Sequence, residues 1–472
     1  MKNLRWVATI VGALLTGVLI LYLSGVLVIE VTNKDGRPKG TIDQVASLRD
    51  RKDLNVLFIL TDTLRAQRLH TYGYERETSP TFDYVASTGV RFARHLAQSS
   101  WTKCSMASLW TGIYPQRTGV LRSPHAAPEA AMMPAEILRD AGFRTAGLWR
   151  NGWVSPQFGF SQGFEVYEKP TPKPIPRGVR AENPNITLEG TDSDVIDAAE
   201  EFLRVHGRER FFLYVHLMDV HQYMYDANSA VFGSNYTDIY DNSVLHTDRV
   251  IGRLLTLFAE QGLLQKTLIV MAADHGEAFG ERGTEGHARE VFLEETDIPL
   301  IIGFPFKLEK GVVVESRTRN IDVWPTVLDL LGLRRLPDAD GHSLVSTILA
   351  SARGLPVPDN EPGFAHLDRG WGRPEYPSRP AIAVVMGSYR FVLQLSPDAR
   401  KDQRIESLFD ASTDPEELHN VIADHPEVAD SLRKLADGYL ESKPPEWASA
   451  PVDVDLGEKE AAELRALGYA VP

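Results

Sequence analysis

Three short apolar runs, each followed at once by an acidic residue, constrain the fold of this 472-residue chain more than any other feature. The runs are residues 55–61 (NVLFILT) before Asp62, residues 211–218 (FFLYVHLM) before Asp219, and residues 268–273 (LIVMAA) before Asp274. Such runs are typical of strands buried on both faces of a sheet. Helical apolar periods lie between them, at residues 193–205 and 241–260. Strands that alternate with helices predict an α/β fold with a mainly parallel central sheet and helices on both faces.

The residues that follow the third run indicate metal chemistry. The chain reads Asp274-His275-Gly276-Glu277 there, and a second histidine stands at position 287. In open α/β sheets, ligands bind beyond the carboxyl ends of the strands. A carboxylate beside an imidazole at that place suits one divalent cation, and Ca, Mg, Mn and Zn all remain candidates.

The N-terminus carries a segment long enough to span a membrane. No charged residue interrupts residues 6–29, and 24 residues at about 1.5 Å each cross a hydrocarbon core of roughly 30 Å. Lys2 and Arg5 precede the segment and Glu30 follows it, which puts the N-terminus in the cytoplasm. A cleaved signal peptide is the alternative, but the bulky residues 27–29 do not fit a small-residue cleavage site. We therefore expect a single-pass anchor and an extracytoplasmic catalytic domain, periplasmic or extracellular.

Composition narrows the class of protein. The formal net charge of −14 argues against a nucleic-acid binder, whose surface would be basic. Cys104 is the one cysteine, so an exported domain would be held by its core without an intramolecular disulfide. Near the C-terminus, residues 381–386 and 389–395 predict two strands and residues 415–439 a helix, which together indicate a smaller α+β subdomain.

The segment SSWTKCSMASLWTG at residues 99–112 supplies a candidate nucleophile. Thr102 is placed to cap a helix that runs to about Gly112. An oxyanion at that helix end would meet free backbone N–H groups and the positive pole of the helix. A metal there would lower the pKa of the Thr102 hydroxyl, although a threonine in such a segment is, taken alone, only a cap.

An ordered series of motifs resembles the sulfatase branch of the alkaline phosphatase superfamily. The motifs lie at residues 55–65, 72–74, 78–80, 102–112, 216–221, 274–277, 286–287, 320–333, 340–344, 407–410, 414–417 with Asn420, and 464–469. The resemblance covers roughly residues 54–469. It implies an alkaline-phosphatase-like fold for the whole extracytoplasmic part. The expected parts are a transmembrane anchor at 6–29, a linker at 30–53, a sulfatase-like catalytic domain at 54–350, a C-terminal subdomain at 351–445 and a tail at 446–472.

The family signature Cys-x-Pro-Ser-Arg-Ala-Ser, whose cysteine matures to formylglycine, falls on residues 102–108 and departs from the pattern in three places. Thr102 replaces the modified cysteine, Cys104 replaces proline and Met106 replaces arginine. Formylglycine is therefore not expected. A threonine at this place is similar to the phosphoethanolamine and phosphoglycerol transferases of the superfamily, in which it attacks phosphorus.

The resemblance implies a role for each matching residue. One divalent metal would be bound by Asp62, Asp274 and His275, with Thr102 completing the site. His221 and His287 would contact the peripheral oxygens of the substrate or protonate the leaving group. The weaker substrate-binding candidates are Lys103 and Arg65.

Three functions follow from these residues. The first is a membrane-anchored, metal-dependent hydrolase of sulfate or phosphate esters, with Thr102 as the nucleophile or as an anion-positioning residue. The second is transfer of a phosphorus-containing head group to a lipid or glycan through a phospho-Thr102 intermediate. The third is a noncatalytic, metal-binding sulfatase homologue. In the first two the partner is an anionic ester, and the oligomeric state stays open.

Overall fold

The computed structural model describes residues 35–184, 190–359, 361–373, 375–395, 404–448, 452–455 and 457–466. The expected anchor at residues 6–29 lies outside these ranges. Within them, no helix combines the length and the apolar character that crossing a bilayer requires. The chain from Arg37 onward forms one compact unit, so the domain boundary expected at residue 350 stays a prediction.

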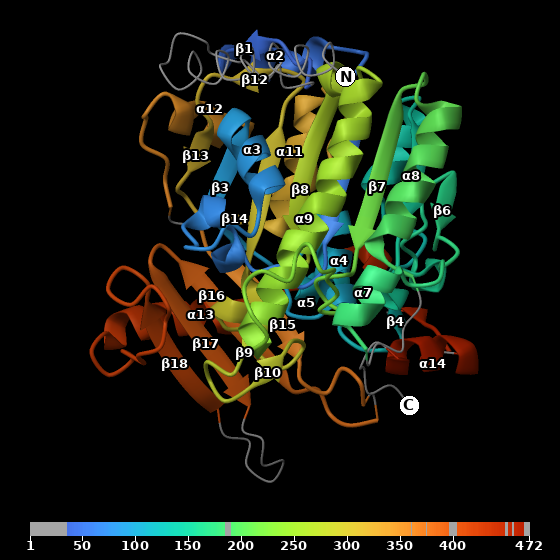
Figure 1. Ribbon diagram of the computed structural model, residues 1–472. Helices are drawn as coiled ribbons and strands as arrows, with labels where there is room; N and C mark the ends of the chain where they lie inside the picture. The colour runs from blue at the N-terminus through green and yellow to red at the C-terminus, as the bar shows by residue number, and fades with distance from the viewer. Residues whose placement is uncertain are drawn as a thin grey trace, which may run out of the picture. The chain divides into compact units, whose positions relative to one another are not determined.

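A nine-stranded sheet, in the order β13-β3-β11-β8-β2-β7-β5-β6 with β14 paired to β3, lies at the centre of this unit (Figure 1). Its strands are β2 (Asn55–Thr61), β3 (Val90–Leu96), β5 (Arg144–Leu148), β6 (Val166–Glu168), β7 (Phe211–Leu217), β8 (Thr267–Ala273), β11 (Asp297–Gly303), β13 (Val312–Val314) and β14 (Thr318–Arg319). Strand β11 runs antiparallel to both of its neighbours, β3 and β8. The other pairings are parallel. The sheet is therefore mixed: it is mainly parallel, as predicted, and β11 is its one antiparallel strand.

The two faces of the sheet carry separate hydrophobic cores, because successive side chains of a strand point to opposite faces. On β2, Val56 and Phe58 belong to one core, and Leu57 and Ile59 to the other. The first core also contains side chains of α4 (Thr102–Thr111), α6 (Pro134–Asp140) and α11 (Val323–Leu330). The second contains side chains of α3 (Pro80–Thr88), α8 (Asp192–His206) and α9 (Tyr236–Glu260). Helices thus cover both faces, as the sequence predicted.

Helices α8 and α9 match the apolar periods at residues 193–205 and 241–260, but α9 begins five residues before its period. The side chain of Asn235 caps it by accepting a hydrogen bond from the Asp238 N–H. Further helices are α2 (Asp43–Ser47), α5 (Pro115–Thr118), α7 (Arg177–Glu182), α10 (Leu293–Thr296), α12 (Val345–Ala352) and α14 (Glu458–Ala466). The short strand pairs are β1 (Lys39–Gly40) with β12 (Lys307–Leu308), β4 (His125–Ala126) with β19 (Val452–Asp453), and β9 (Ala278–Phe279) with β10 (Glu285–Gly286).

A second, antiparallel sheet of four strands lies toward the C-terminus (Figure 1). Its strands are β15 (Gly363–Asp368), β16 (Pro380–Met386), β17 (Tyr389–Leu395) and β18 (Arg404–Asp410). Helix α13 (Pro426–Leu440) packs on it through Leu432 and Ala436. The predicted strands at 381–386 and 389–395 are confirmed. The helix expected from residue 415 begins only at Pro426, which occupies the first helical turn, where a missing N–H is tolerated.

The register of the central strands sets the edge at which the site forms. Thr61, the last residue of β2, lies opposite Leu217 of β7 on one side and Ala273 of β8 on the other. The three parallel strands therefore end level with one another. The residues that follow them, including Asp62 and Asp274, emerge at a common edge of the sheet.

Candidate active site

Asp62 directly follows β2 and is fully buried. Its Oδ2 accepts hydrogen bonds from the Asn151 side-chain amide (2.6 Å) and from Nε2 of His216 (3.0 Å). The Tyr214 hydroxyl lies 2.7 Å from Nδ1 of His216, so a hydroxyl donor there leaves Nε2 protonated toward Asp62. Burial alone raises the pKa of Asp62, but the His216 bond and the neighbouring imidazoles outweigh burial and lower it. Asp62 is therefore held ionised, with its Oδ1 still without a hydrogen-bond partner among the described residues.

Asp274 directly follows β8 and is equally buried. Its Oδ1 accepts from the backbone N–H of His275 (2.9 Å) and of Thr63 (3.3 Å). Its Oδ2 is buried and has no hydrogen-bond partner among the residues described. Burial and repulsion from Asp62 raise the pKa of Asp274. Each aspartate thus has one oxygen satisfied by the protein and one left over.

The backbone between these groups is strained. Thr63 has a φ of 59°, a left-handed conformation that is unfavourable for a β-branched residue. Its hydroxyl donates to the Asp62 carbonyl at 2.7 Å, and its N–H is turned to Asp274. Strain of this kind costs about 1–3 kcal/mol and is concentrated at functional sites. Here it directs a backbone donor at Asp274, which fixes the orientation of that carboxylate.

Thr102 lies at the N-terminus of α4, but it is the first helical residue and Trp101 is the N-cap. The prediction that Thr102 caps the helix is therefore wrong, whereas the helix end at Gly112 is confirmed. The Thr102 hydroxyl is free of the cap role and lies 3.1 Å from Nε2 of His275. The Ser105 hydroxyl donates to the Asp274 carbonyl at 2.6 Å, which ties this end of the helix to the end of β8.

His275 brings a ring nitrogen to the two aspartates. Its Nδ1 lies 3.0 Å from the Gly276 carbonyl, which accepts only a protonated nitrogen, so the neutral tautomer has its lone pair on Nε2. Nε2 lies 3.4 Å from Oδ2 of Asp274 and 3.8 Å from Oδ1 of Asp62. These are the two oxygens that have no hydrogen-bond partner within the described part of the chain.

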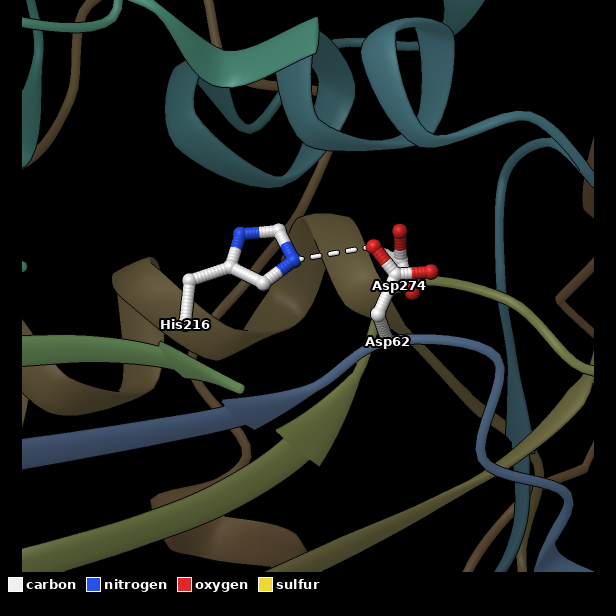
Figure 2. Close-up of side chains that lie close together, drawn as sticks. All are labelled: Asp62, His216 and Asp274. Carbon is white, nitrogen blue, oxygen red and sulfur yellow. Dashed lines mark hydrogen bonds and ion pairs between the residues drawn. The ribbon is translucent and has the colours of Figure 1, made fainter. Parts of the chain in front are cut away.

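The donor set fits one divalent cation. Ligands at bond lengths of about 2.0–2.6 Å around one ion lie roughly 3–4 Å apart, and His275 Nε2 lies at such a distance from each of the two free oxygens. Asp62, His216 and Asp274 also offer atoms within 4.8 Å of one another, and Figure 2 shows His216 directed at Asp62 beside Asp274. We favour His275 as the ligand, because Nε2 of His216 already donates its proton to Asp62. His216 then orients Asp62 from behind, as ligand-supporting histidines and carboxylates do.

His221 and His287 stand together at the same centre. The ring centroids of His221 and His287 lie 4.9 Å apart, and those of His275 and His287 lie 4.6 Å apart. Burial lowers the pKa of His221 to about 4, so this ring is neutral near pH 7. Burial also opposes protonation of His287, but the Glu277 carboxylate, 3.0 Å from its Nδ1, raises the pKa of His287 above its ordinary value. The pKa values of the two histidines are therefore shifted in opposite directions, which suits His287 for proton donation.

The two basic residues predicted to bind substrate are engaged elsewhere. Nζ of Lys103 donates to the Ser123 carbonyl at 2.5 Å and lies 3.9 Å from the ring centroid of Phe158. Burial lowers the pKa of Lys103 well below its ordinary value. The Arg65 guanidinium forms an ion pair with Glu281 at 2.5 Å. The structure thus supports neither as a contact to an anion at Thr102.

Sequence reasoning missed Asn151 and gave His216 no role at the site. His216 lies inside an apolar run, where a histidine is usually a satisfied core side chain, and only its proximity to Asp62 distinguishes it. Asn151 follows β5 by three residues, at the same edge of the sheet as the other site residues. The run in β5 is short and contains Thr145 and Gly147, so no apolar pattern marked the strand.

Comparisons with known proteins bear on this arrangement. The Sulfatase family model matches residues 54–333. The ulvan-active sulfatase of Formosa agariphila is 24% identical over 428 residues, which are 82% of this chain and 80% of that protein. Human arylsulfatase A is 25% identical over 474 residues, covering 85% and 90% of the two chains. The crystal structure of the phosphonate monoester hydrolase of Agrobacterium radiobacter aligns with a TM-score of 0.64 at 18% identity, covering 86% of this chain and 98% of that one. With a family model matched over more than half of its length and the fold shared with solved relatives, this chain belongs to the sulfatase family.

Proposed function

We propose that the protein is a metal-dependent hydrolase of sulfate or phosphate esters in which Thr102 is the nucleophile. The observation that carries the proposal is the pair of buried carboxylate oxygens of Asp62 and Asp274, without a partner among the described residues. Both lie within 4 Å of Nε2 of His275, which is 3.1 Å from the Thr102 hydroxyl. Membership of the sulfatase family and the names of the relatives support ester hydrolysis. The comparisons lend no support to the head-group transferase.

Thr102, His287 and His221 have separate roles in the proposed reaction. The Thr102 hydroxyl would release its proton to solvent, and Oγ1 would attack sulfur or phosphorus while the bond from that atom to the ester oxygen breaks. A bound divalent cation would lower the pKa of the Thr102 hydroxyl and offset charge on the transferred group. His287, whose pKa is raised by Glu277, would give a proton to the leaving oxygen, and neutral His221 would contact the transferred group. Water would then cleave the Thr102 ester and restore the hydroxyl.

A substrate panel tests the proposal. It would compare 4-nitrophenyl sulfate, 4-nitrophenyl phosphate, bis(4-nitrophenyl) phosphate and 4-nitrophenyl phenylphosphonate, with EDTA and with Ca²⁺, Mg²⁺, Mn²⁺ or Zn²⁺. We expect metal-dependent turnover that Thr102→Ala abolishes and Thr102→Ser retains in part. Intact-mass and peptide analysis should find the sulfuryl or phosphoryl adduct on Thr102. Full turnover by Thr102→Ala would refute the nucleophile. Absence of turnover and of adduct in the wild type would favour the noncatalytic homologue.

We further propose that residues 6–29 anchor the protein in a membrane with the catalytic part outside the cytoplasm. The support is the uncharged stretch itself and the basic residues that precede it. Carbonate washing of membranes should leave the full-length protein in the pellet, and protease added to intact spheroplasts should digest it. A chain released by carbonate would contradict the anchor.

A further inference from the structure

Asn151 is the polar side chain of the active centre to which neither the sequence nor the comparisons assign a role. It is fully buried and precedes the short 3-10 helix Gly152–Val154. One atom of its side chain, Nδ2, contacts two oxygen atoms of the site. Nδ2 lies 2.6 Å from Oδ2 of Asp62 and 3.3 Å from Oγ1 of Thr102.

The orientation of the amide follows from its other contact. Oδ1 of Asn151 accepts the backbone N–H of Trp153 at 2.9 Å, and an NH₂ group could not accept there. The NH₂ group must therefore face Asp62 and Thr102. Its two hydrogens match the two oxygen acceptors on that side.

Thr102 consequently has a fixed donor beside it. Oγ1 lies 3.3 Å from Nδ2 of Asn151, which has a hydrogen to donate, and 3.1 Å from Nε2 of His275, the favoured metal ligand. When Oγ1 gives its proton to solvent and attacks, the amide donor stays with it, and this hydrogen bond is stronger toward the anion than toward the neutral hydroxyl. When the adduct is hydrolysed, the same donor stabilises the departing Thr102 oxygen.

We propose that Asn151 is a catalytic donor of this site, which stabilises Oγ1 of Thr102 as an anion and holds Asp62 in position for the cation. With Oδ2 of Asp62 fixed by Asn151 and His216, Oδ1 is left to face His275 and Asp274. One amide thereby couples the nucleophile to the metal ligand. The catalytic half of this inference rests on the proposed hydrolase, whereas the ligand-positioning half does not.

Asn151→Ser is the informative variant, because it separates the donor from a merely structural role. Serine is as good an N-cap as asparagine, so the cap on the 3-10 helix is retained, but its side chain is too short to donate to Asp62 and Thr102. Asn242→Ser is the matched control. Asn242 is also fully buried, and its amide bonds to the backbone of Val231, Phe232 and Gly233.

Two readouts are needed, and the first requires no turnover. Calorimetric titration of the metal-free protein with Mn²⁺ should give a dissociation constant about tenfold higher for Asn151→Ser than for the wild type, as for other supports of metal ligands. Steady-state kinetics on the best ester of the panel should give a kcat about 100-fold lower with a KM within a fewfold, the loss typical of one removed oxyanion donor. Asn242→Ser should change neither.

The outcomes separate the two proposals. A wild type that binds Mn²⁺ but hydrolyses no ester refutes the hydrolase, and the titration alone then decides on Asn151. Mn²⁺ binding by Asn151→Ser within threefold of the wild type refutes the ligand-positioning role. A kcat within threefold of the wild type, under conditions where Thr102→Ala is inactive, refutes the catalytic role.

Discussion

Asp274→Asn should stabilise the metal-free protein and abolish its response to metal. Asp62 and Asp274 offer oxygens within 4.8 Å of each other, and in each carboxylate one oxygen has no donor among the described residues. Two full charges at that distance repel by about 3.5 kcal/mol at an effective dielectric constant of about 20. Part of this is already relieved, because the pKa of Asp274 is raised.

The amide introduced by Asp274→Asn would keep an oxygen for the two backbone donors and turn its NH₂ group toward Asp62. We therefore expect a gain of about 1–3 kcal/mol in the free energy of unfolding without metal. With an unfolding entropy of about 2.1 cal/mol/K per residue, this corresponds to a rise in Tm of about 1–3 °C. The wild type should gain about 2.7 kcal/mol when metal is present at 100 times its Kd, and the variant almost nothing.

Scanning calorimetry in EDTA and in a series of metal concentrations measures both effects. Asp322→Asn is the control, because Asp322 is a buried carboxylate that is paired with Arg319 at 2.9 Å. Breaking that pair should destabilise the protein by about 3–5 kcal/mol with or without metal. If Asp274→Asn lowers the Tm in EDTA as the control does, the two aspartates do not repel, and the inference of a cation site fails.

Two further variants probe the histidines and the buried lysine. In Glu277→Gln, the pKa of His287 should fall, because the carboxylate that raises it is lost. His287 is protonated only below its pKa. The alkaline limb of the kcat/KM profile should therefore move to lower pH. Glu281→Gln should leave the profile in place, and an unshifted limb in Glu277→Gln would rule out His287 as the acid. Lys103→Met should keep kcat/KM within about threefold of the wild type, because the Lys103 amine is bonded to the Ser123 carbonyl and not to the site. The substitution leaves that carbonyl unpaired, which should lower the free energy of unfolding by about 1–3 kcal/mol, as measured in thermal melts. A loss of 100-fold or more in Lys103→Met would restore Lys103 as a substrate contact.

The strands that carry the site could be predicted because each is an unbroken apolar run, as expected for a strand buried on both faces of a sheet. Strand β2 matches the run at residues 55–61, and β7 and β8 match the other two within one residue at each end. Each is buried throughout, so its apolar run is unbroken and visible. Strands β15 and β18 of the C-terminal sheet were missed, because His366 and Asp368 in one, and Arg404 and Glu406 in the other, break the apolar pattern.

The sequence predicted a site residue of the central sheet only where that residue directly follows a strand. Asp62 and Asp274 were found in this way, and their proximity follows from the parallel register of β2 and β8. Asn151 could not be found, because its distance to Thr102 depends on the path of the chain after β5. The environment of Lys103 was equally hidden, since the aromatic rings around its ammonium group come partly from residues about 50 positions away, such as Trp153.

The place of β2 between β7 and β8 has a consequence for the order of folding. Thr63 and Asp274 lie 211 residues apart in the chain, so Asp62 and Asp274 meet only after β2 and β8 have paired. Closing so long a loop is slow, and contacts of this kind form late. A metal would therefore find its ligands assembled only in the nearly native chain, and it would act by slowing unfolding rather than by speeding folding. For a protein exposed to proteases outside the cytoplasm, as we propose, such kinetic protection would govern its lifetime.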